Sequence, residues 1–286
     1  MTRFAFERLC PVCGEETRFV ELYRKWGYAI GKCDVCGLGA TRVAAGFDPS
    51  AIYTASYFEG DTRDGYAGYA SSERVLRMEF RRVVDELVRC GCEGGRLLEI
   101  GCAYGFFLLD AQRRFDVTGV ELSPHAAEVC RSRGLEVHCG SVEDGFLQHR
   151  APFEAAVMLD VIEHLEDPGR ALHAVRAALR PGGMLVLSTG NWASFVSRVT
   201  RSSWRLMTPP QHLFFFSKPT LTQMLGRLGF EVIKCSHPWK IVPLSLLVFQ
   251  LLRVVGLPNR AVPRLGNLGI PVNLFDALRL VARRAE

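Results

Sequence analysis

The sequence predicts an α/β fold with a largely parallel sheet, preceded by a small metal-binding β module. From about residue 96 onward, short apolar runs alternate with amphipathic helical stretches, which is the rhythm of a parallel sheet. Ahead of these runs, two Cys-x-x-Cys pairs stand about 20 residues apart. At 286 residues the chain is long enough for one large domain, or for one large and one small.

The cysteine pairs are Cys10 with Cys13 and Cys33 with Cys36, all within residues 1–46. Each pair forms a tight turn that directs two thiolates at one point, and four thiolates complete the tetrahedral shell of Zn²⁺. A closed shell leaves no position for water, so the predicted site is structural. A segment this short lacks a core of its own and needs the metal to fold.

The composition of the chain indicates its cellular location and its possible binding partners. Residues 1–9 lack the apolar stretch of a signal peptide, and the ten cysteines then read as metal ligands and buried thiols. We therefore expect a cytoplasmic protein. The net charge of +5 is modest and the N-terminal segment has no Lys/Arg cluster, so we expect no nucleic-acid partner.

A glycine turn between a strand and a helix is the central motif. The apolar run 96–100 carries Glu99 near its end, and Gly101 and Gly105 follow before a helical stretch. Glycine lets the backbone turn sharply and lets a ligand approach closely. Glu121 closes the next apolar strand, about 20 residues on, where a β-α-β nucleotide site offers a carboxylate to the ribose hydroxyls.

The pattern favours a nucleoside that carries a positive charge. A dinucleotide site requires Gly-x-Gly-x-x-Gly, and the third glycine is absent here. Glu99 would repel a pyrophosphate but can accept a hydrogen bond from the ammonium group of an amino acid. A nicotinamide-dependent oxidoreductase built on the same turn remains the alternative.

Residues 99–105 resemble motif I of the class I S-adenosylmethionine (SAM)-dependent methyltransferases, with Ala103 where the middle glycine usually stands. The Leu-x-Pro-Gly-Gly turn at 179–183 is a second feature of that family, and the resemblance runs from about Tyr53 to the C-terminus. It implies a Rossmann-like sheet of seven mostly parallel strands, of which the last, 274–282, is antiparallel. The cysteine segment is similar to the zinc-ribbon modules of bacterial methyltransferases.

These boundaries predict three segments. Residues 1–46 form the zinc-ribbon-like module. Residues 47–95 form an aromatic lid segment and a leading helix. Residues 96–286 form the SAM-dependent methyltransferase core, with an apolar insertion at 238–271.

The resemblance also implies which residues bind SAM. Glu99 is expected near the methionine moiety, Glu121 at the ribose, and Ser141 and Val142 at the adenine edge. Tyr57 is expected to close over the cofactor. The predicted cofactor-binding set is Tyr57, Glu99, Gly101, Cys102, Ala103, Gly105, Glu121, Leu122, Ser141, Val142, Leu159 and Asp160.

His164 and His212 are the predicted catalytic residues. The sulfonium of SAM is already a strong electrophile, so a base is needed only when the acceptor loses a proton, as a hydroxyl does. We therefore expect methyl transfer to a small-molecule acceptor, at a hydroxyl of a sugar, a lipid-linked compound or a natural-product intermediate. The pair Glu163–His164 resembles one that helps to bind a divalent metal in quinone-type O-methyltransferases. A non-catalytic regulatory protein that binds zinc and SAM is a further alternative.

The stretch 241–255 is strongly apolar, but it is too short and too interrupted for a spanning helix, which needs about 20 apolar residues. Three interpretations remain open. The stretch is a lid over an apolar acceptor, the interface of a homodimer, or a helix on a membrane surface beside Arg253, Arg260 and Arg264. A lipid-tailed acceptor would unite the first and the third.

Overall fold

In the computed structural model the described residues are 4–59, 69–150, 152–245, 248 and 268–286. The chain divides into two compact units, which are described separately below. The first unit comprises Met1–Pro49, Val142–Pro238 and Leu274–Glu286. The second unit comprises Ser50–Ser141 and Trp239–Asn273.

The main sheet has seven strands in the order β11-β14-β9-β8-β5-β6-β7. Strands β5, β6 and β7 pair in parallel, as do β8 and β9, whereas β14 is antiparallel to both β9 and β11. The predicted sheet, mostly parallel with an antiparallel last strand, is therefore confirmed. Its strands are β5 (Arg96–Ile100), β6 (Asp116–Glu121), β7 (Val137–Cys139), β8 (Phe153–Leu159), β9 (Leu179–Gly190), β11 (Phe230–Ser236) and β14 (Ala277–Arg284).

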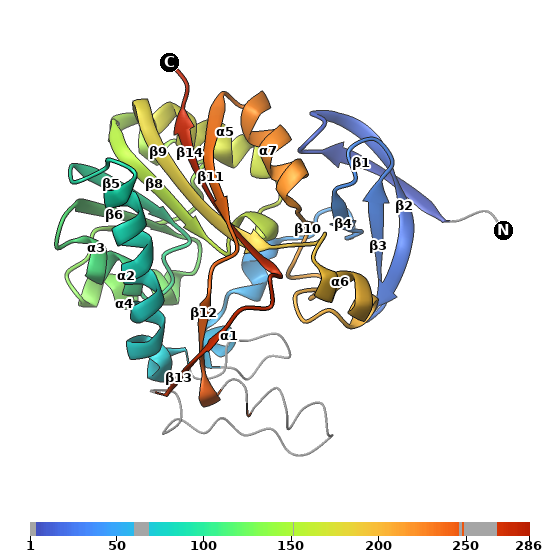
Figure 1. The fold of residues 1–286 in the computed structure, drawn as a ribbon, viewed down its shortest axis with the longest axis horizontal. Coiled ribbons are helices and arrows are strands. Elements are labelled where there is room, and N and C mark those ends of the chain that lie inside the picture. Colours follow the sequence, from blue (N-terminus) through green and yellow to red (C-terminus); the bar gives the residue numbers. More distant parts are fainter. Residues whose placement is uncertain (1–3, 60–68, 151, 246–247, 249–267) are drawn as a thin grey trace. The chain divides into compact units, whose positions relative to one another are not determined.

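In the first unit, α5 packs beside β9 and α7 beside β11 (Figure 1). Asp167 caps α5 by accepting a hydrogen bond from the Arg170 N–H at 2.9 Å. The predicted turn at 179–183 lies inside β9, because strand pairing with β8 already begins at Leu179. The helices and 3₁₀ turns of this unit are η3 (Phe146–His149), η4 (Ile162–His164), α5 (Pro168–Ala178), α6 (Phe195–Thr200), η5 (Arg201–Ser203) and α7 (Lys218–Arg227).

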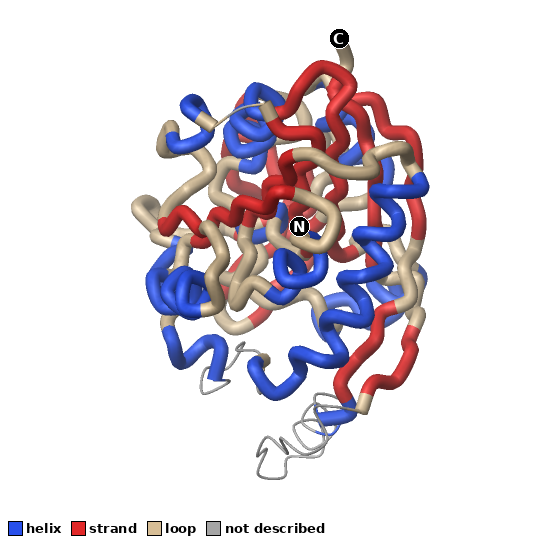
Figure 2. Tube along the Cα trace, turned by 90° about the vertical axis from the view of Figure 1, so that its left-hand side faces the viewer, coloured by secondary structure: helices blue, strands red, loops and turns tan. Residues whose placement is uncertain are grey.

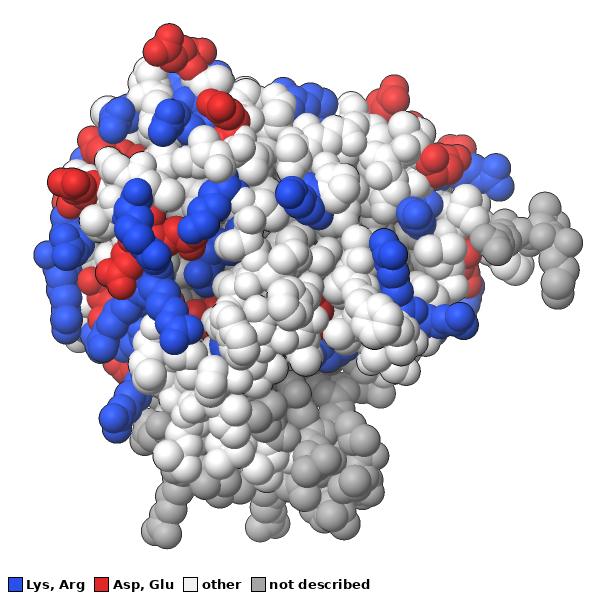
Figure 3. Space-filling model, viewed as in Figure 1, with Lys and Arg blue, Asp and Glu red and all other residues white. Residues whose placement is uncertain are grey.

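In the second unit, α2 is amphipathic, as its sequence pattern predicts. It buries Val75, Val83, Val84 and Leu87, while Lys and Arg side chains gather over it on the face shown in Figure 3. The helices of this unit are α1 (Ala55–Glu59), η2 (Ala70–Ser72), α2 (Glu73–Arg89), α3 (Phe106–Ala111) and α4 (Pro124–Ser132). A further 3₁₀ turn, η1 (Pro49–Ile52), precedes α1.

The ends of the predicted apolar insertion form a two-stranded ribbon, β12 (Lys240–Pro243) and β13 (Gly269–Val272). The ribbon lies alongside α2 (Figures 1 and 2), and the Lys240 ammonium is 3.2 Å from the Glu79 carboxylate. Most of the stretch 241–255 lies outside the described residues, so its three interpretations stay predictions. Among the helices that the structure describes, none is both long and apolar enough to cross a membrane.

The N-terminal module, residues 1–46, contributes four strands to an antiparallel sheet in the order β1-β2-β3-β4-β10. Strand β10 (Phe214–Phe215) comes from the far end of the sequence and pairs with β4. The first four strands are β1 (Ala5–Cys10), β2 (Glu15–Lys25), β3 (Tyr28–Cys33) and β4 (Gly39–Thr41).

Candidate functional site

The glycine turn after β5 has three residues in the left-handed region. Their φ angles are +71° at Gly101, +47° at Ala103 and +74° at Gly105. A Cβ on Gly105 would lie 2.3 Å from Cδ1 of Leu135, so a side chain there would have to displace Leu135 and adopt a positive φ. Ala103 adopts a left-handed conformation at a cost of about 1 kcal/mol.

Glu121 ties the end of β6 to this turn. One carboxylate oxygen accepts from the Ala103 N–H and the other from the Ser123 N–H, each at 2.8 Å. Burial raises the pKa of Glu121, whereas these backbone hydrogen bonds lower it. A carboxylate has about four lone-pair sites, so Glu121 is held in place by the backbone and still has acceptor capacity for hydroxyls.

Glu99 is a buried carboxyl at the base of the same turn. It is 4% exposed, and among the described residues its Oε2 has no hydrogen-bond partner. Burial raises its pKa well above the ordinary value, and the charges of Cys130 and Glu121 raise it further. A buried acid without a partner is suited to a cation, because an ammonium group would supply the missing hydrogen bond and charge.

This burial gives Glu99 a measurable pH signature. Its folded pKa lies above the unfolded value of 4.5, so its contribution to stability is complete below about pH 4.5 and is lost as the pH rises through the folded pKa. Glu99→Gln removes this loss. We measure the thermal midpoints of E99Q and of the wild type by calorimetry, both without ligand. The difference, E99Q minus wild type, should be more positive at pH 8 than at pH 5. Glu128→Gln is the control, because that side chain is 75% exposed. If the difference between E99Q and the wild type did not depend on pH, the raised pKa of Glu99 would be refuted.

His164 and His212 lie together in the first unit, although 48 positions separate them (212 − 164). Their ring centroids are 4.6 Å apart and the rings are nearly perpendicular. Burial lowers the pKa of His164 to about 4 and that of His212 well below its ordinary value, so both imidazoles are neutral at physiological pH. His164 Nδ1 bonds to the Gln211 carbonyl at 3.0 Å, and His212 bonds to the Leu206 carbonyl. His212 therefore keeps its other ring nitrogen as an acceptor, whereas His164 also bonds to the backbone of Asp160.

Glu163 completes a three-residue cluster with these histidines. One potential ligand atom from each of Glu163, His164 and His212 lies within 4.8 Å of the others. Two imidazole nitrogens and a carboxylate form a donor set that suits a divalent transition metal. Asp160 lies nearby at the carboxyl end of β8, where its carboxylate accepts from the Ser188 hydroxyl at 2.8 Å.

The four cysteines of the N-terminal module converge as predicted. Their sulfur atoms lie within 4.8 Å of one another, with Cys10–Cys36 at 3.5 Å and Cys13–Cys33 at 3.9 Å. A zinc tetrahedron with Zn–S bonds of about 2.3 Å has S–S edges of about 3.8 Å, and a disulfide needs about 2 Å. The hydrogen bond from Cys36 lowers the pKa of Cys10 to about 5. The cluster thus fits a four-thiolate metal site.

Comparison with known proteins identifies the family. The sequence pattern of the methyltransferase domain matches residues 73–235, which is more than half of the chain. The chain belongs to the SAM-dependent methyltransferase family. This membership excludes the nicotinamide-dependent alternative.

Among curated relatives of this methyltransferase are ubiquinone biosynthesis O-methyltransferases. The protein from Alkalilimnicola ehrlichii is 33% identical over 117 residues, covering 38% of this chain and 47% of the relative. The protein from Xylella fastidiosa strain 9a5c is 29% identical over 169 residues, covering 53% of this chain and 69% of the relative. The match to the first of these spans about half of the relative's length.

Solved structures agree on the fold. Magnesium protoporphyrin IX methyltransferase from Synechocystis PCC 6803 with bound SAH gives a TM-score of 0.53 at 14% identity, covering 82% of this chain and 98% of that chain. A methyltransferase in complex with the Haloferax volcanii Trm112 methyltransferase activator gives 0.55 at 12% identity, covering 85% and 100%. At these identities the likeness establishes the fold alone.

The predicted SAM-binding residues of the methyltransferase divide between the two units, and their role stays a prediction. In the second unit, Tyr57 on α1 packs edge-on against Tyr53 and Phe58, at centroid distances of 5.2 and 5.1 Å. The second unit holds Tyr57, Glu99, Gly101, Cys102, Ala103, Gly105, Glu121, Leu122 and Ser141. The first unit holds Val142, Leu159 and Asp160.

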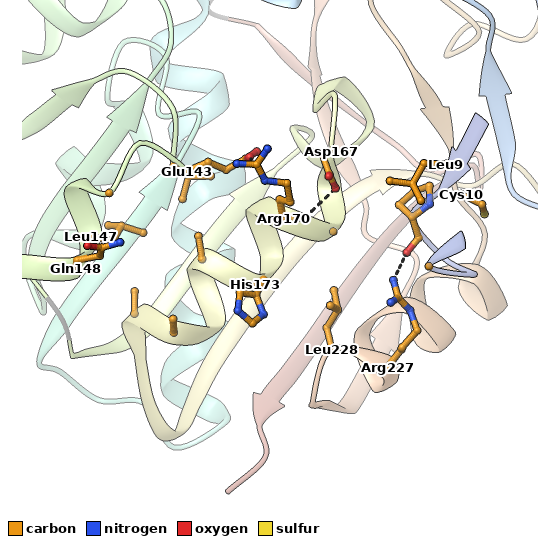
Figure 4. Close-up of a pocket in the computed structure, with 18 residues that line it drawn as sticks. Leu9, Cys10, Glu143, Leu147, Gln148, Asp167, Arg170, His173, Arg227 and Leu228 are labelled. Carbon is orange, nitrogen blue, oxygen red and sulfur yellow. Dashed lines mark hydrogen bonds and ion pairs between the residues drawn. The ribbon is translucent and has the colours of Figure 1, made fainter. Parts of the chain in front are cut away.

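A cavity of about 740 Å³ lies within the first unit (Figure 4). It is bordered by the first cysteine turn and by α5, and two of its arginines are bound to neighbouring groups. Arg170 lies 3.2 Å from the Glu143 carboxylate, and Arg227 donates to the Pro11 carbonyl at 2.6 Å. Among the described residues of the predicted cofactor set, Val142 is the one that lines it. We therefore do not assign this cavity to the reaction.

Proposed function

We propose that the protein transfers a methyl group from SAM to a hydroxyl oxygen of a small-molecule acceptor. The observation that carries this proposal is the buried, neutral pair His164 and His212, since a hydroxyl acceptor must lose a proton during transfer. The curated relatives are named O-methyltransferases, which supports oxygen as the atom that accepts the methyl group.

In this proposal the glycine turn and the two carboxylates bind SAM. Glu121 accepts from the ribose hydroxyls through the lone pairs that its backbone contacts leave available. Glu99 accepts from the ammonium group of the methionine moiety, which explains a buried carboxyl with an unsatisfied oxygen. Ser141 and Val142 contact the adenine edge, as the resemblance implies.

The acceptor binds beside His212, whose free ring nitrogen takes the hydroxyl proton as the methyl group is transferred. Glu163, His164 and His212 also form a donor set for a divalent cation, which would acidify a bound hydroxyl. The two roles are distinguished by chelation. If activity persists in EDTA, the imidazole acts alone; if it is lost and Mg²⁺ or Zn²⁺ restores it in the wild type but not in Glu163→Gln, the cluster holds a cation.

The cysteine cluster is proposed to hold one structural Zn²⁺. Its four sulfurs fill the coordination shell, and backbone groups support them, because the Leu38 N–H donates to Cys36 Sγ at 3.5 Å. No ligand position is left for water or substrate, so this ion would take no part in methyl transfer.

The function is tested with SAM labelled with ¹³C on its methyl group, offered with phenols, catechols, sugars and amines. We expect S-adenosylhomocysteine to form and the label to appear on oxygen by NMR. His212→Gln should lower kcat about 100-fold and leave SAM affinity unchanged. His173→Gln, an exposed histidine of α5, is the matched control. Label on nitrogen or carbon, or SAM binding without turnover as a regulatory protein would show, would refute the proposal.

A further inference from the structure

The N-terminal module is joined to the His212 segment by a shared sheet. Strand β4 pairs with β3 on one side and with β10 on the other, with Phe214 opposite Ala40 and Phe215 opposite Gly39 (Figure 1). The Thr41 N–H extends this ladder by donating to the Leu213 carbonyl at 2.9 Å. The backbone next to His212 therefore belongs to the sheet of the module.

Thr41 also holds His212 directly. Its hydroxyl donates to the His212 carbonyl at 2.7 Å, and its side chain is fully buried. The His212 N–H donates to the Thr208 carbonyl at 2.9 Å, and the Leu213 N–H donates to the Glu163 carbonyl at 2.8 Å. The Thr41 hydroxyl is thus one of the groups that fix the His212 backbone. That backbone in turn determines where the His212 imidazole lies relative to Glu163.

The position of Thr41 is in turn set by the cysteine cluster. The second cysteine turn leads straight into β4, because the Cys33 N–H donates to the Leu38 carbonyl at 2.8 Å and the Leu38 N–H donates to Cys36 Sγ. From β1, the Arg8 guanidinium donates to the Thr41 carbonyl at 3.1 Å. The second cysteine turn and strand β1 therefore both hold Thr41 in position.

Attachment of the module does not require this contact. An apolar cluster that includes Ile30 of the module together with Trp204 and Phe215 already joins it to the rest of the first unit. Arg227 of α7 adds its bond to the Pro11 carbonyl. Attachment alone would allow a valine at position 41, so the buried hydroxyl on the His212 carbonyl calls for a different explanation.

We infer that the N-terminal module positions the His212 imidazole for methyl transfer, and that Thr41 is the positioning residue through which it acts. The inference rests on the proposed function for the role of His212. A metal bound by the cysteine turns would then raise the rate of methyl transfer without touching the substrate. It would act through a series of contacts that runs from Cys36 through Leu38 and Thr41 to His212.

The first test compares Thr41→Val with Thr41→Ser in the metal-loaded enzyme. Valine keeps the shape of threonine and removes the donor, so kcat should fall about 10- to 100-fold while the KM for SAM stays close to the wild type. Stability should fall by no more than the loss of one buried hydrogen bond, so the fold persists. Serine keeps the donor and should restore kcat. The control is Thr200→Val, because Thr200 also donates to a backbone carbonyl, that of Val196, at 2.7 Å, at an exposed site on α6.

The second test reads the coupling without activity, by hydrogen–deuterium exchange. Thr41→Val, and the wild type stripped of metal, should exchange faster in peptides covering 209–216 than the metal-loaded wild type. Peptides covering 97–105 should not change. Wild-type kcat in T41V, equal loss in T41V and T41S, or unchanged exchange at 209–216 would each overturn the inference. Full activity of His212→Gln with faster exchange in T41V would instead refute the proposed base and retain the coupling.

Discussion

Glu121→Gln is expected to weaken SAM binding about 100-fold. The carboxylate now receives the Ala103 and Ser123 N–H groups on its two oxygens, and SAM would add its two ribose hydroxyls. A glutamine must turn an NH₂ group toward one of these donors, which removes an acceptor and leaves a buried N–H unpaired. Hydrogen bonds to a charged group contribute about 1.5–3 kcal/mol each, so a loss of about 3 kcal/mol is expected.

Isothermal titration of SAM into both proteins measures this effect. Glu128→Gln on α4 is the control, because its side chain is 75% exposed and belongs to the same unit. The thermal midpoint of each variant shows whether the fold persists. A dissociation constant for E121Q within twofold of the wild type would remove Glu121 from the binding site.

Cys33→Ser is expected to remove the bound zinc and to unfold the N-terminal module. Cys33 is 1% exposed, and its sulfur lies 3.9 Å from that of Cys13 and 3.2 Å from the Thr17 hydroxyl. Structural zinc contributes about 10–16 kcal/mol to the folding of small modules, far more than the core of such a module supplies.

Metal analysis should find one zinc fewer per chain in C33S than in the wild type. Cys235→Ser is the control, because Cys235 is a partly buried thiol on β11 of the same unit. The thermal midpoint should fall for C33S alone. Equal zinc in the two variants would show that the four thiols are not a metal site.

Local patterns were sufficient to predict the central part of the fold. The turn between β5 and α3 was predictable because its glycines, its carboxylate and its flanking apolar runs are adjacent in sequence. The boundaries of β5 match those read from the sequence, and α4 begins at Pro124 behind its Ser123 cap. The helical stretch predicted after Gly105 is short and ends at Ala111, because residues 112–114 form a turn into β6.

The contacts that define the histidine cluster could not be predicted from local sequence patterns. His164 and His212 were each predicted as bases, but nothing in the sequence places them 4.6 Å apart. The carbonyls of Leu206 and Gln211, which fix the ring orientations, have no side-chain signal at all. Thr41 was missed for the same reason, because its partner His212 lies 171 residues away. Burial, which sets the low pKa of both imidazoles, appears only after packing is known.

The shared sheet also affects how the chain matures on the ribosome. The outer side of β4 has no neighbour until Phe214 and Phe215 have been synthesised, so the newborn module presents an open hydrogen-bonding edge for most of translation. An isolated fragment ending near residue 46 would keep that edge permanently and would tend to associate with other copies.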